Sequence, residues 1–229
     1  MSECRWLDHG HLPEVIALHA EALRGVPAGR VAREHDAFFA AHMAECGRIA
    51  GVFAHGRLVA YAVLGLPAEG APNFGEDHGL SAAELRRVAH LDGVAVSPPW
   101  RGRGLQRQLI ELRLTLARAQ GRDIVLATAA PDNPASVLNL LQAGLRARGL
   151  RQRFGGWRYL MRLDLLAAPL RWQEAVRSLS CADIEGQRAL LAQGWQGCAL
   201  IAGRDDAPQP EWAGGPAMLF RRPGPDPVS

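Results

Sequence analysis

One continuous stretch, residues 87–120, constrains the fold more than any other part of the sequence. Residues 87–97 have the pattern of a strand, and two prolines follow them. A glycine-rich turn follows at 101–106, and residues 105–120 have the apolar spacing of an amphipathic helix. A strand, a glycine-rich turn and a helix in direct succession predict an α/β unit with an anion-binding turn.

Hydrophobic periodicity predicts further elements on both sides of this unit. The predicted strands are residues 3–8, two strands within 48–66 joined at Ala54-His55-Gly56, and residues 124–130, 156–165, 172–180, 197–203 and 217–222. The predicted helices are residues 13–23, 31–45, 133–148 and 183–193, and residues 67–82 read as a loop. This order indicates a mixed α/β fold rather than a helical bundle or a sandwich, with no apparent internal repeat.

Length and composition bound the domain organisation. The chain has 229 residues, of which 48% are hydrophobic and 21% charged, as in ordinary globular proteins. We expect residues 1–165 to form the main domain, residues 166–222 a C-terminal annex, and residues 223–229 a flexible tail. The annex is too small to bury its apolar faces alone, so we expect it to pack on the body of its own chain or of a partner.

Residue usage excludes several classes of function. The chain contains no lysine, which excludes a P-loop, a Schiff base and an SxxK nucleophile. Its four cysteines form no CxxC pair, so we expect neither a disulfide framework nor a metal site. No apolar run reaches the ~18–20 residues of a membrane span, and the first 24 residues lack a signal-peptide core. We therefore expect a cytoplasmic protein without membrane contact.

The basic residues are concentrated around the glycine-rich turn. Residues 98–165 contain 12 arginines against four acidic residues, a local charge of +8. A Walker A motif would need the missing lysine, and a dinucleotide fingerprint would need glycine at Arg107. A nucleic-acid interface is disfavoured because no aromatic residues alternate with the arginines. The basic stretch is then either a solvated face or a cradle for a small polyanion bound at residues 101–106, and the charge pattern does not decide between them.

Two segments together carry a family resemblance, VAVSPPWRGRGLQRQLIELRLTLA (94–117) and NPASVLNLLQAGL (133–145). They closely resemble the GNAT N-acetyltransferase superfamily, in which a V-x-P strand end runs into R/Q-x-x-G-x-G/A and a later helix opens with N-x-x-A/S. The matching residues are Arg101, Gly104, Asn133, Ser136 and Gly144. The order of elements matches across residues 1–165, and the last 64 residues lie outside the resemblance.

The resemblance implies a GNAT-like acyl-CoA N-acyltransferase fold, with a mixed central sheet flanked by helices. The apolar pattern of residues 166–222 adds a C-terminal strand–helix–strand–strand annex. It implies transfer of an acetyl group from acetyl-CoA to a primary amine of a small molecule or peptide, by direct attack in a ternary complex. Because the family often forms dimers, we expect a homodimer with the annex at the interface. The competing arrangement is a monomer whose annex partly covers the acceptor cleft.

The resemblance also assigns the cosubstrate site. The residues implied to bind coenzyme A are Val94, Ala95, Val96, Arg101, Gly102, Arg103, Gly104, Leu105, Gln106, Asn133 and Ser136. A backbone N–H near Val94, on a bulge at Gly93, would meet the developing oxyanion. Arg107, with Arg101 and Arg103, is expected to approach the phosphates.

A base is also expected, because an alkylammonium of pKa ~10.4 loses its proton at pH 7 at a cost of roughly 4.6 kcal/mol. Strand alternation places His90, Asp92, Val94 and Val96 on one face. His90 aligns with a glutamate base of some family members and is the first candidate. Asp92, acting through a water molecule, is the second.

Three residues depart from the family pattern. Gln106 replaces a small residue, Leu145 replaces the usual Phe, and Leu140 stands where many members carry a tyrosine thought to protonate the departing thiolate. Neither Tyr61 nor Tyr159 belongs to that helix. The alternative function is therefore a catalytically silent, GNAT-like module that binds coenzyme A as a sensor or interaction platform.

Overall fold

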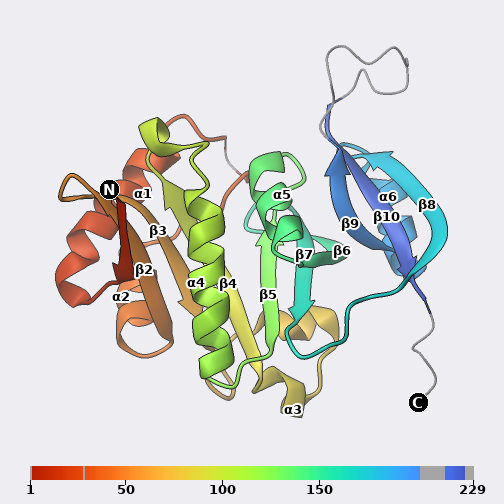
Figure 1. The fold of residues 1–229 in the computed structure, drawn as a ribbon, viewed down its shortest axis with the longest axis horizontal. Helices are drawn as coiled ribbons and strands as arrows, with labels where there is room; N and C mark the ends of the chain where they lie inside the picture. Colours follow the sequence, from red (N-terminus) through yellow and green to blue (C-terminus); the bar gives the residue numbers. More distant parts are fainter. Residues whose placement is uncertain (1, 28, 202–214, 225–229) are drawn as a thin grey trace.

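A computed structural model describes residues 2–27, 29–201 and 215–224, and these form a single ten-stranded sheet in the order β1-β2-β3-β4-β5-β7-β6-β9-β10-β8 (Figure 1). The strands are β1 (Ser2–Trp6), β2 (Gly47–Ala54), β3 (Arg57–Gly65), β4 (Val88–Val96), β5 (Ile124–Ala129), β6 (Arg146–Arg153), β7 (Gly156–Asp164), β8 (Trp172–Ser180), β9 (Gln196–Ile201) and β10 (Ala217–Pro223). The α-helices are α1 (Leu12–Leu23), α2 (Asp36–Ala44), α3 (Ala82–Leu85), α4 (Leu105–Ala119), α5 (Pro134–Gln142) and α6 (Ile184–Ala192). Three short 3-10 helices are η1 (His9–His11), η2 (Phe74–His78) and η3 (Pro98–Trp100).

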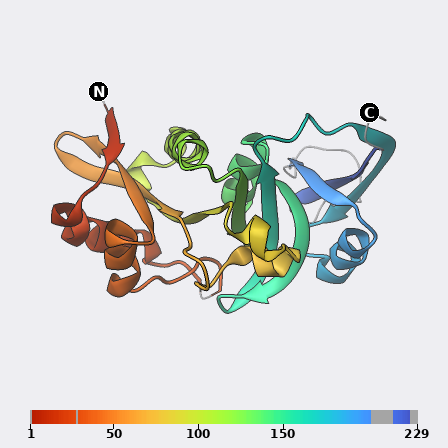
Figure 2. The ribbon, with the colours of Figure 1, turned by 90° about the horizontal axis from the view of Figure 1, so that it is seen from below.

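The N-terminal half of the sheet is covered on both faces, with α1 and α2 on one side and α4 on the other (Figure 2). Phe39 of α2 packs with Tyr61 of β3, whereas Leu109 of α4 packs with Ala60 on the opposite face. Neighbouring strands are antiparallel except for β4 and β5, which are parallel. This architecture confirms the mixed central sheet flanked by helices that the sequence predicted.

Two predicted helices have different bounds in the structure. The helix predicted over 31–45 begins only at Asp36, because the His35 side chain accepts the N–H of Phe38 and caps it there. The helix predicted to reach residue 148 ends at Gln142. Gly144 adopts a φ of 99° and the Leu145 N–H donates to the Leu140 carbonyl, the hydrogen bond that closes a Schellman motif. Residues 146–153, predicted partly as helix, form strand β6 instead.

Strand β6 decides where the annex attaches. β7 lies between β5 and β6, so β6 is the strand that β9 joins. The annex packs on its own chain, since one apolar cluster contains Tyr159 and Met161 of β7 together with annex residues such as Trp195. Inside this cluster the Tyr159 hydroxyl donates to Oε1 of Gln187 at 2.5 Å.

The annex repeats the architecture of the preceding unit, contrary to the expectation of no internal repeat. Strand–helix–strand–strand β8-α6-β9-β10 matches β5-α5-β6-β7, and the central strand of each trio is the last in sequence. Each helix has nine residues, and the caps Asn133 and Asp183 lie fifty positions apart. Each helix is followed by a glycine of positive φ, Gly144 or Gly194. The annex is therefore a second copy of one half of the fold.

The two copies also share strand register and face each other symmetrically. β6 skips Arg148 in pairing with β7, and β9 skips Cys198, its equivalent, in pairing with β10. β6 and β9 pair at Ala147 and Gly197, which are again fifty positions apart. Helix α5 contacts β9 as α6 contacts β6. Because equivalent residues meet on antiparallel strands, a local twofold axis relates the two units.

Candidate functional site

A cavity of about 850 Å³ lies where β4 and β5 separate. The two strands pair in parallel up to Leu91 and Ala127, after which β4 pairs only with β3 (toward the top of Figure 1). The side of residues 92–96 that faces β5 therefore has no strand partner there. The cavity lies between this segment of β4, the end of β5 and the starts of α4 and α5.

Most of the residues predicted to bind coenzyme A line this cavity. They are Val94, Ala95, Val96, Arg101, Gly102, Gly104, Leu105, Gln106, Asn133 and Ser136. Arg107 lines it as well. Arg103 is outside that lining, and its guanidinium lies 4.7 Å from the ring centroid of Trp100. The structure thus brings the two motifs of the sequence to one cavity.

A β-bulge on β4 shapes the cavity wall. Asp92 and Gly93 together oppose Val63, where the register of β3 against β4 shifts. The bulge expected at Gly93 is present, and it breaks the expected alternation. His90 and Asp92 lie on the face of α2, as the contact of Asp92 with His42 shows.

Beyond the bulge the side chains change faces. Val94 and Val96 pack on the opposite side, beside Leu105 and Leu109 of α4. The prediction that His90, Asp92, Val94 and Val96 share one face is therefore wrong. The extra residue in β4 shifts every later side chain by one position.

The glycine-rich turn has the backbone that an anion site requires. Gly102 and Gly104 both have a φ of 75°, a conformation that L side chains rarely adopt, and Gly104 leads directly into the 15 residues of α4. The first N–H groups of a helix point outward with the positive end of its dipole. Arg101 donates to the carbonyls of Val96 and Ala22, which ties the turn to β4 and α1. The turn therefore fits a pyrophosphate group.

The three departures from the family pattern have distinct structural consequences. Gln106 donates to Oγ of Ser136 at 3.3 Å and accepts from Nδ2 of Asn139 at 2.9 Å, so it links the starts of α4 and α5. Leu140 and Leu145 are buried in the main apolar cluster. The position of the family tyrosine therefore faces the core in this chain.

Asp92 is the predicted base candidate that lines the cavity. Its Oδ2 lies 3.6 Å from Nε2 of His42 and 3.8 Å from Nδ1 of His90. His42 is oriented by its Nδ1, which donates to the Phe38 carbonyl at 2.8 Å. Burial lowers the pKa of His42, but Asp92, the Phe38 carbonyl and Glu34 together raise it above its ordinary value. A Cβ at Gly65 would overlap Oδ2 of Asp92, so the carboxylate occupies space that glycine leaves open.

His90 is outside the cavity lining. Its ring stacks on Phe74 with centroids 4.2 Å apart, and its Nε2 accepts the N–H of Phe74 at 3.2 Å. Burial lowers the pKa of His90, which favours the neutral ring. The structure therefore separates the two candidates: the carboxylate of Asp92 faces the cavity, and the imidazole of His90 lies behind it.

Sequence reasoning missed several side chains that line the cavity near Asp92. Glu34 is one, and a Cβ added at Gly93 would lie 3.7 Å from its Cγ. Burial and the charge of Asp92 raise the pKa of the Glu34 carboxyl. Tyr61 is another, with its hydroxyl 2.7 Å from Nδ1 of His19. No motif marks Glu34, which lies in a segment predicted as helix.

Two loops meet over this end of the cavity. Arg158 of β7 donates to the Gly29 carbonyl at 2.5 Å, and a Cβ at Gly29 would lie 2.6 Å from the Gly155 carbonyl oxygen. Only glycine permits such a close approach of two backbones. Phe154 beside this contact meets Phe74 of η2, with ring centroids 6.3 Å apart. The α1–α2 loop, the β6–β7 hairpin and η2 thus form a roof over the end of the cavity near Asp92.

Within residues 2–27, 29–201 and 215–224, no group of three or more His, Cys, Asp or Glu side chains is arranged to hold a metal ion. No helix in the same ranges is long and apolar enough to cross a membrane.

Comparisons with known proteins agree with this geometry. An N-acetyltransferase structure from Staphylococcus aureus Mu50 is 18% identical, with a TM-score of 0.56, covering 72% of this chain and 99% of that one. A GNAT superfamily phosphinothricin acetyltransferase from Sinorhizobium meliloti, in complex with acetyl-CoA, is 15% identical, with a TM-score of 0.53, covering 71% and 87%. A Salmonella typhimurium structure with its cofactor acetyl-CoA is 19% identical, with a TM-score of 0.54, covering 74% and 98%.

These structural likenesses concern the fold alone. Among curated protein sequences the search finds no match. Residues 14–143, more than half of the chain, match the Acetyltransferase (GNAT) family. The matched region contains the strand β4, the glycine-rich turn and the helix α5 that surround the cavity. The chain therefore belongs to the GNAT acetyltransferase family.

Proposed function

We propose that this protein is an acetyl-CoA-dependent N-acetyltransferase that acetylates a primary amine by direct attack in a ternary complex. The observation that supports this most is the cavity between β4 and β5, because it has an anion-binding turn at one end and two carboxylates at the other. A polyanionic acyl donor suits the first end and a cationic acceptor suits the second. Family membership supports the same chemistry.

The donor end offers backbone and arginine contacts. The amides of the turn 101–106 would hold the pyrophosphate, and Arg107 lies beside them. The backbone of Val94, freed from strand pairing by the separation of β4 and β5, would donate to the developing oxyanion. Coenzyme A itself supplies the activated thioester. A thiol of pKa ~8.5 leaves readily, so water can return its proton although Leu140 replaces the family tyrosine.

The acceptor end is suited to an ammonium group. Among the described residues neither Glu34 nor Asp92 forms an ion pair with an arginine, and each lines the cavity. A protonated amine between the two carboxylates would offset part of their negative charge on binding. Asp92, directly or through a water molecule, would then take the proton that must leave before attack. His90 would act on this step through Asp92, since its Nδ1 faces that carboxylate.

The roof over the acceptor end favours an acceptor with a narrow reacting end. The contact of Gly29 with Gly155 closes one side of the acceptor end, which leaves room for a small molecule or an extended peptide end rather than a folded surface.

Localisation and assembly are proposals as well. We propose a cytoplasmic homodimer in which the annex, residues 166–222, contributes to the interface beside the main domain, residues 1–165. In the described chain β8 pairs only with β10, so its other edge is open to a partner strand. The alternative of an annex lid is disfavoured, because the described annex residues lie outside the cavity lining. Residues 225–229 of the expected tail lie outside the described residues.

One observation favours a second function, a silent sensor that binds coenzyme A. Leu140 is buried in the core, so α5 presents no proton donor at the position where many family members carry tyrosine. Such a module would bind coenzyme A with the same turn and release no thiol with any amine.

The Gly104→Asp variant tests the cosubstrate site. An aspartate there would place a side chain and a negative charge in the turn, and we expect coenzyme A affinity measured by calorimetry to fall at least about 100-fold. Gly194→Asp is the matched control, because Gly194 has a φ of 83° in the annex and a similar backbone strain. Unchanged affinity in Gly104→Asp, or an equal loss in both variants, would show that the turn is not the site.

A further inference from the structure

One arginine lies inside the core beneath the proposed site. Arg113 of α4 is 1% exposed, and the neighbouring positions on its helix face are apolar, among them Leu109, Leu114 and Ala117. Desolvation of an arginine costs several kcal/mol unless other groups compensate it. A leucine would fill such a position at no such cost. The presence of a cation here therefore calls for a specific role.

The hydrogen bonds of Arg113 converge on the β4 bulge. Its Nη1 donates to the carbonyl of Val63 at 3.0 Å and to that of Asp92 at 3.4 Å. Its Nε donates to the Leu109 carbonyl at 3.1 Å, which fixes the side chain against its own helix. Val63 is the residue of β3 that opposes the two bulged residues of β4. The guanidinium thus binds carbonyl groups on both sides of the irregularity.

The same arginine is the cation behind the Asp92 carboxylate. Burial lowers the pKa of Arg113 to about 10, and the charge of Asp92 opposes that change. Arg113 is therefore still protonated at neutral pH. The other titratable groups facing Asp92 are His42 from α2, His90 from β4 itself, Glu34 from the segment before α2 and Cys46 from the segment after it. Of these five neighbours, Arg113 alone carries a fixed positive charge.

We propose that Arg113 is a positioning residue, which holds the β4 bulge in register and sets the charge around Asp92 from behind the sheet. This inference rests on the proposed function, since it assigns to Arg113 the orientation of the proposed base and of the backbone after Gly93. Loss of the bulge would shift residues 94–96 by one position and move their side chains to the opposite face. Helix α4 would then carry two parts of the site, the phosphate turn at its start and the bulge support two turns further on.

The test compares Arg113→Met with Arg113→Lys. Methionine fills a similar volume without charge or donors, and lysine keeps the charge with a single donor group. We expect Arg113→Met to lower kcat for acetyl transfer at least about tenfold, while its coenzyme A affinity by calorimetry stays within about twofold. Removal of a fixed positive charge makes it easier for the site to bind a proton, so the acidic limb of kcat/KM against pH should move up by about half a unit or more. Arg113→Lys should keep the wild-type limb and recover most of kcat.

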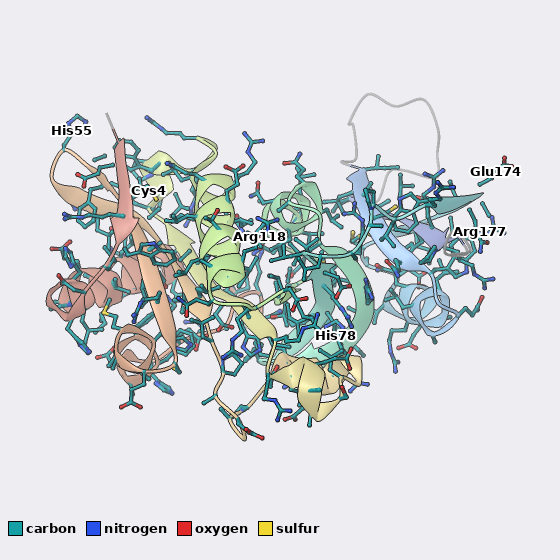
Figure 3. The ribbon with its side chains drawn as sticks, turned by 60° about the horizontal axis from the view of Figure 1, so that its bottom comes forward. Cys4, His55, His78, Arg118, Glu174 and Arg177 are labelled. Carbon is teal, nitrogen blue, oxygen red and sulfur yellow. The ribbon has the colours of Figure 1, made fainter. Side chains whose placement is uncertain are left out.

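Arg118→Met is the matched control, because Arg118 lies on the exposed side of the same helix (Figure 3). It should leave kcat, KM and the pH profile unchanged. If Arg113→Met does not fold, Arg113→Gln takes its place, and the same shift of the acidic limb is expected.

Two results would overturn the proposal. One is a folded, uncharged variant with wild-type kcat. The other is a loss of activity with an unchanged pH profile that lysine does not recover, since a merely structural arginine would behave in that way. Failure of the wild-type protein to acetylate any amine would instead refute the proposed function.

Discussion

The chain contains two versions of one structural unit, and among the described residues only the first of them borders the cavity. Residues 124–164 and residues 172–223 share the order of strands and helix, the cap at the start of the helix and the glycine at its end. They differ in what lies beside the first strand of each unit, β5 or β8. β5 takes β4 as a neighbour and then separates from it, whereas β8 has no partner on that side within the described residues.

Charge at the helix start differs as well. The cap of α5 is the neutral Asn133, and its first turn contains no acidic residue. The cap of α6 is Asp183, followed by Glu185. Acidic side chains at a helix start stabilise the helix but repel phosphate. We infer that the repeated strand–helix–strand–strand unit gives structural support. The site depends on β4, its bulge and the glycine-rich turn, which all precede that unit in the chain.

Removal of the annex should have the largest effect. Truncation after Leu166 would uncover the edge of β6 and the apolar cluster around Tyr159. We expect loss of the soluble fold or a fall in Tm of about 10–20 °C, equivalent to about 5 kcal/mol. Light scattering would report the assembly. A truncated protein that is monomeric or aggregates supports the proposed interface, and one that is soluble and still dimeric contradicts it.

Asp92 of β4 has no counterpart beside β8 among the described residues. Because its carboxylate lines the cavity, we expect its removal to affect chemistry rather than folding. We expect Asp92→Asn to lower kcat by about 10²–10⁴ at pH 7. The loss should shrink at high pH as the amine loses its proton unaided. Steady-state rates across pH would measure this.

His90→Ala is the paired variant for the same experiment. We expect a smaller loss than in Asp92→Asn, because His90 contacts the carboxylate and lies outside the cavity lining. A larger loss in His90→Ala would transfer the role of base to His90. A loss that is independent of pH in both variants would indicate a binding or structural role instead.

The two units also differ where they meet. Gln187 of α6 occupies the position of Val137 in α5, and it accepts from Tyr159 while donating to the carbonyls of Ser180 and Cys181. We expect Gln187→Val to lower the free energy of unfolding by about 1–3 kcal/mol in urea denaturation, because three buried polar groups lose a partner. Tyr159→Phe completes a double-mutant cycle. Strictly additive effects would show that the bond does not couple the two units.

The smallest effect concerns the caps. Asn133→Asp gives the body the cap of the annex, and we expect coenzyme A affinity by calorimetry to fall about two- to fivefold, a change of about 0.3–1 kcal/mol. The reciprocal variant, Asp183→Asn, should leave that affinity unchanged. An equal effect of both variants would contradict the assignment of the site to the body alone.

Local signals made much of this structure predictable. His55 and Gly56 form the two-residue hairpin turn with φ of 51° and 74°, as their sequence indicates. The glycine-rich turn and the Asn133 cap reached one cavity as the motifs implied. The annex elements were also predictable, since each has its own apolar pattern.

Features set by long-range pairing were not predictable. The repeat escaped detection because, from Leu140 to Leu150, the two copies share only Leu140, Leu141, Gly144 and Leu150 with their counterparts fifty residues on. A bulge was expected at Gly93, but its effect on the face of Val94 depends on the register of β4 against β3, which no local pattern sets. Glu34 belongs to the acceptor end only because the α1–α2 loop folds over β4.

Product analysis with purified protein tests the central claim most directly. Acetyl-CoA is incubated with a panel of small amines and short peptides, and free thiol and acetylated amine are both quantified. We predict saturable release of thiol in equal amount to a new N-acetyl product, and loss of both in Asp92→Asn at neutral pH. Saturable coenzyme A binding without thiol or product across the whole panel would contradict it and support the silent sensor.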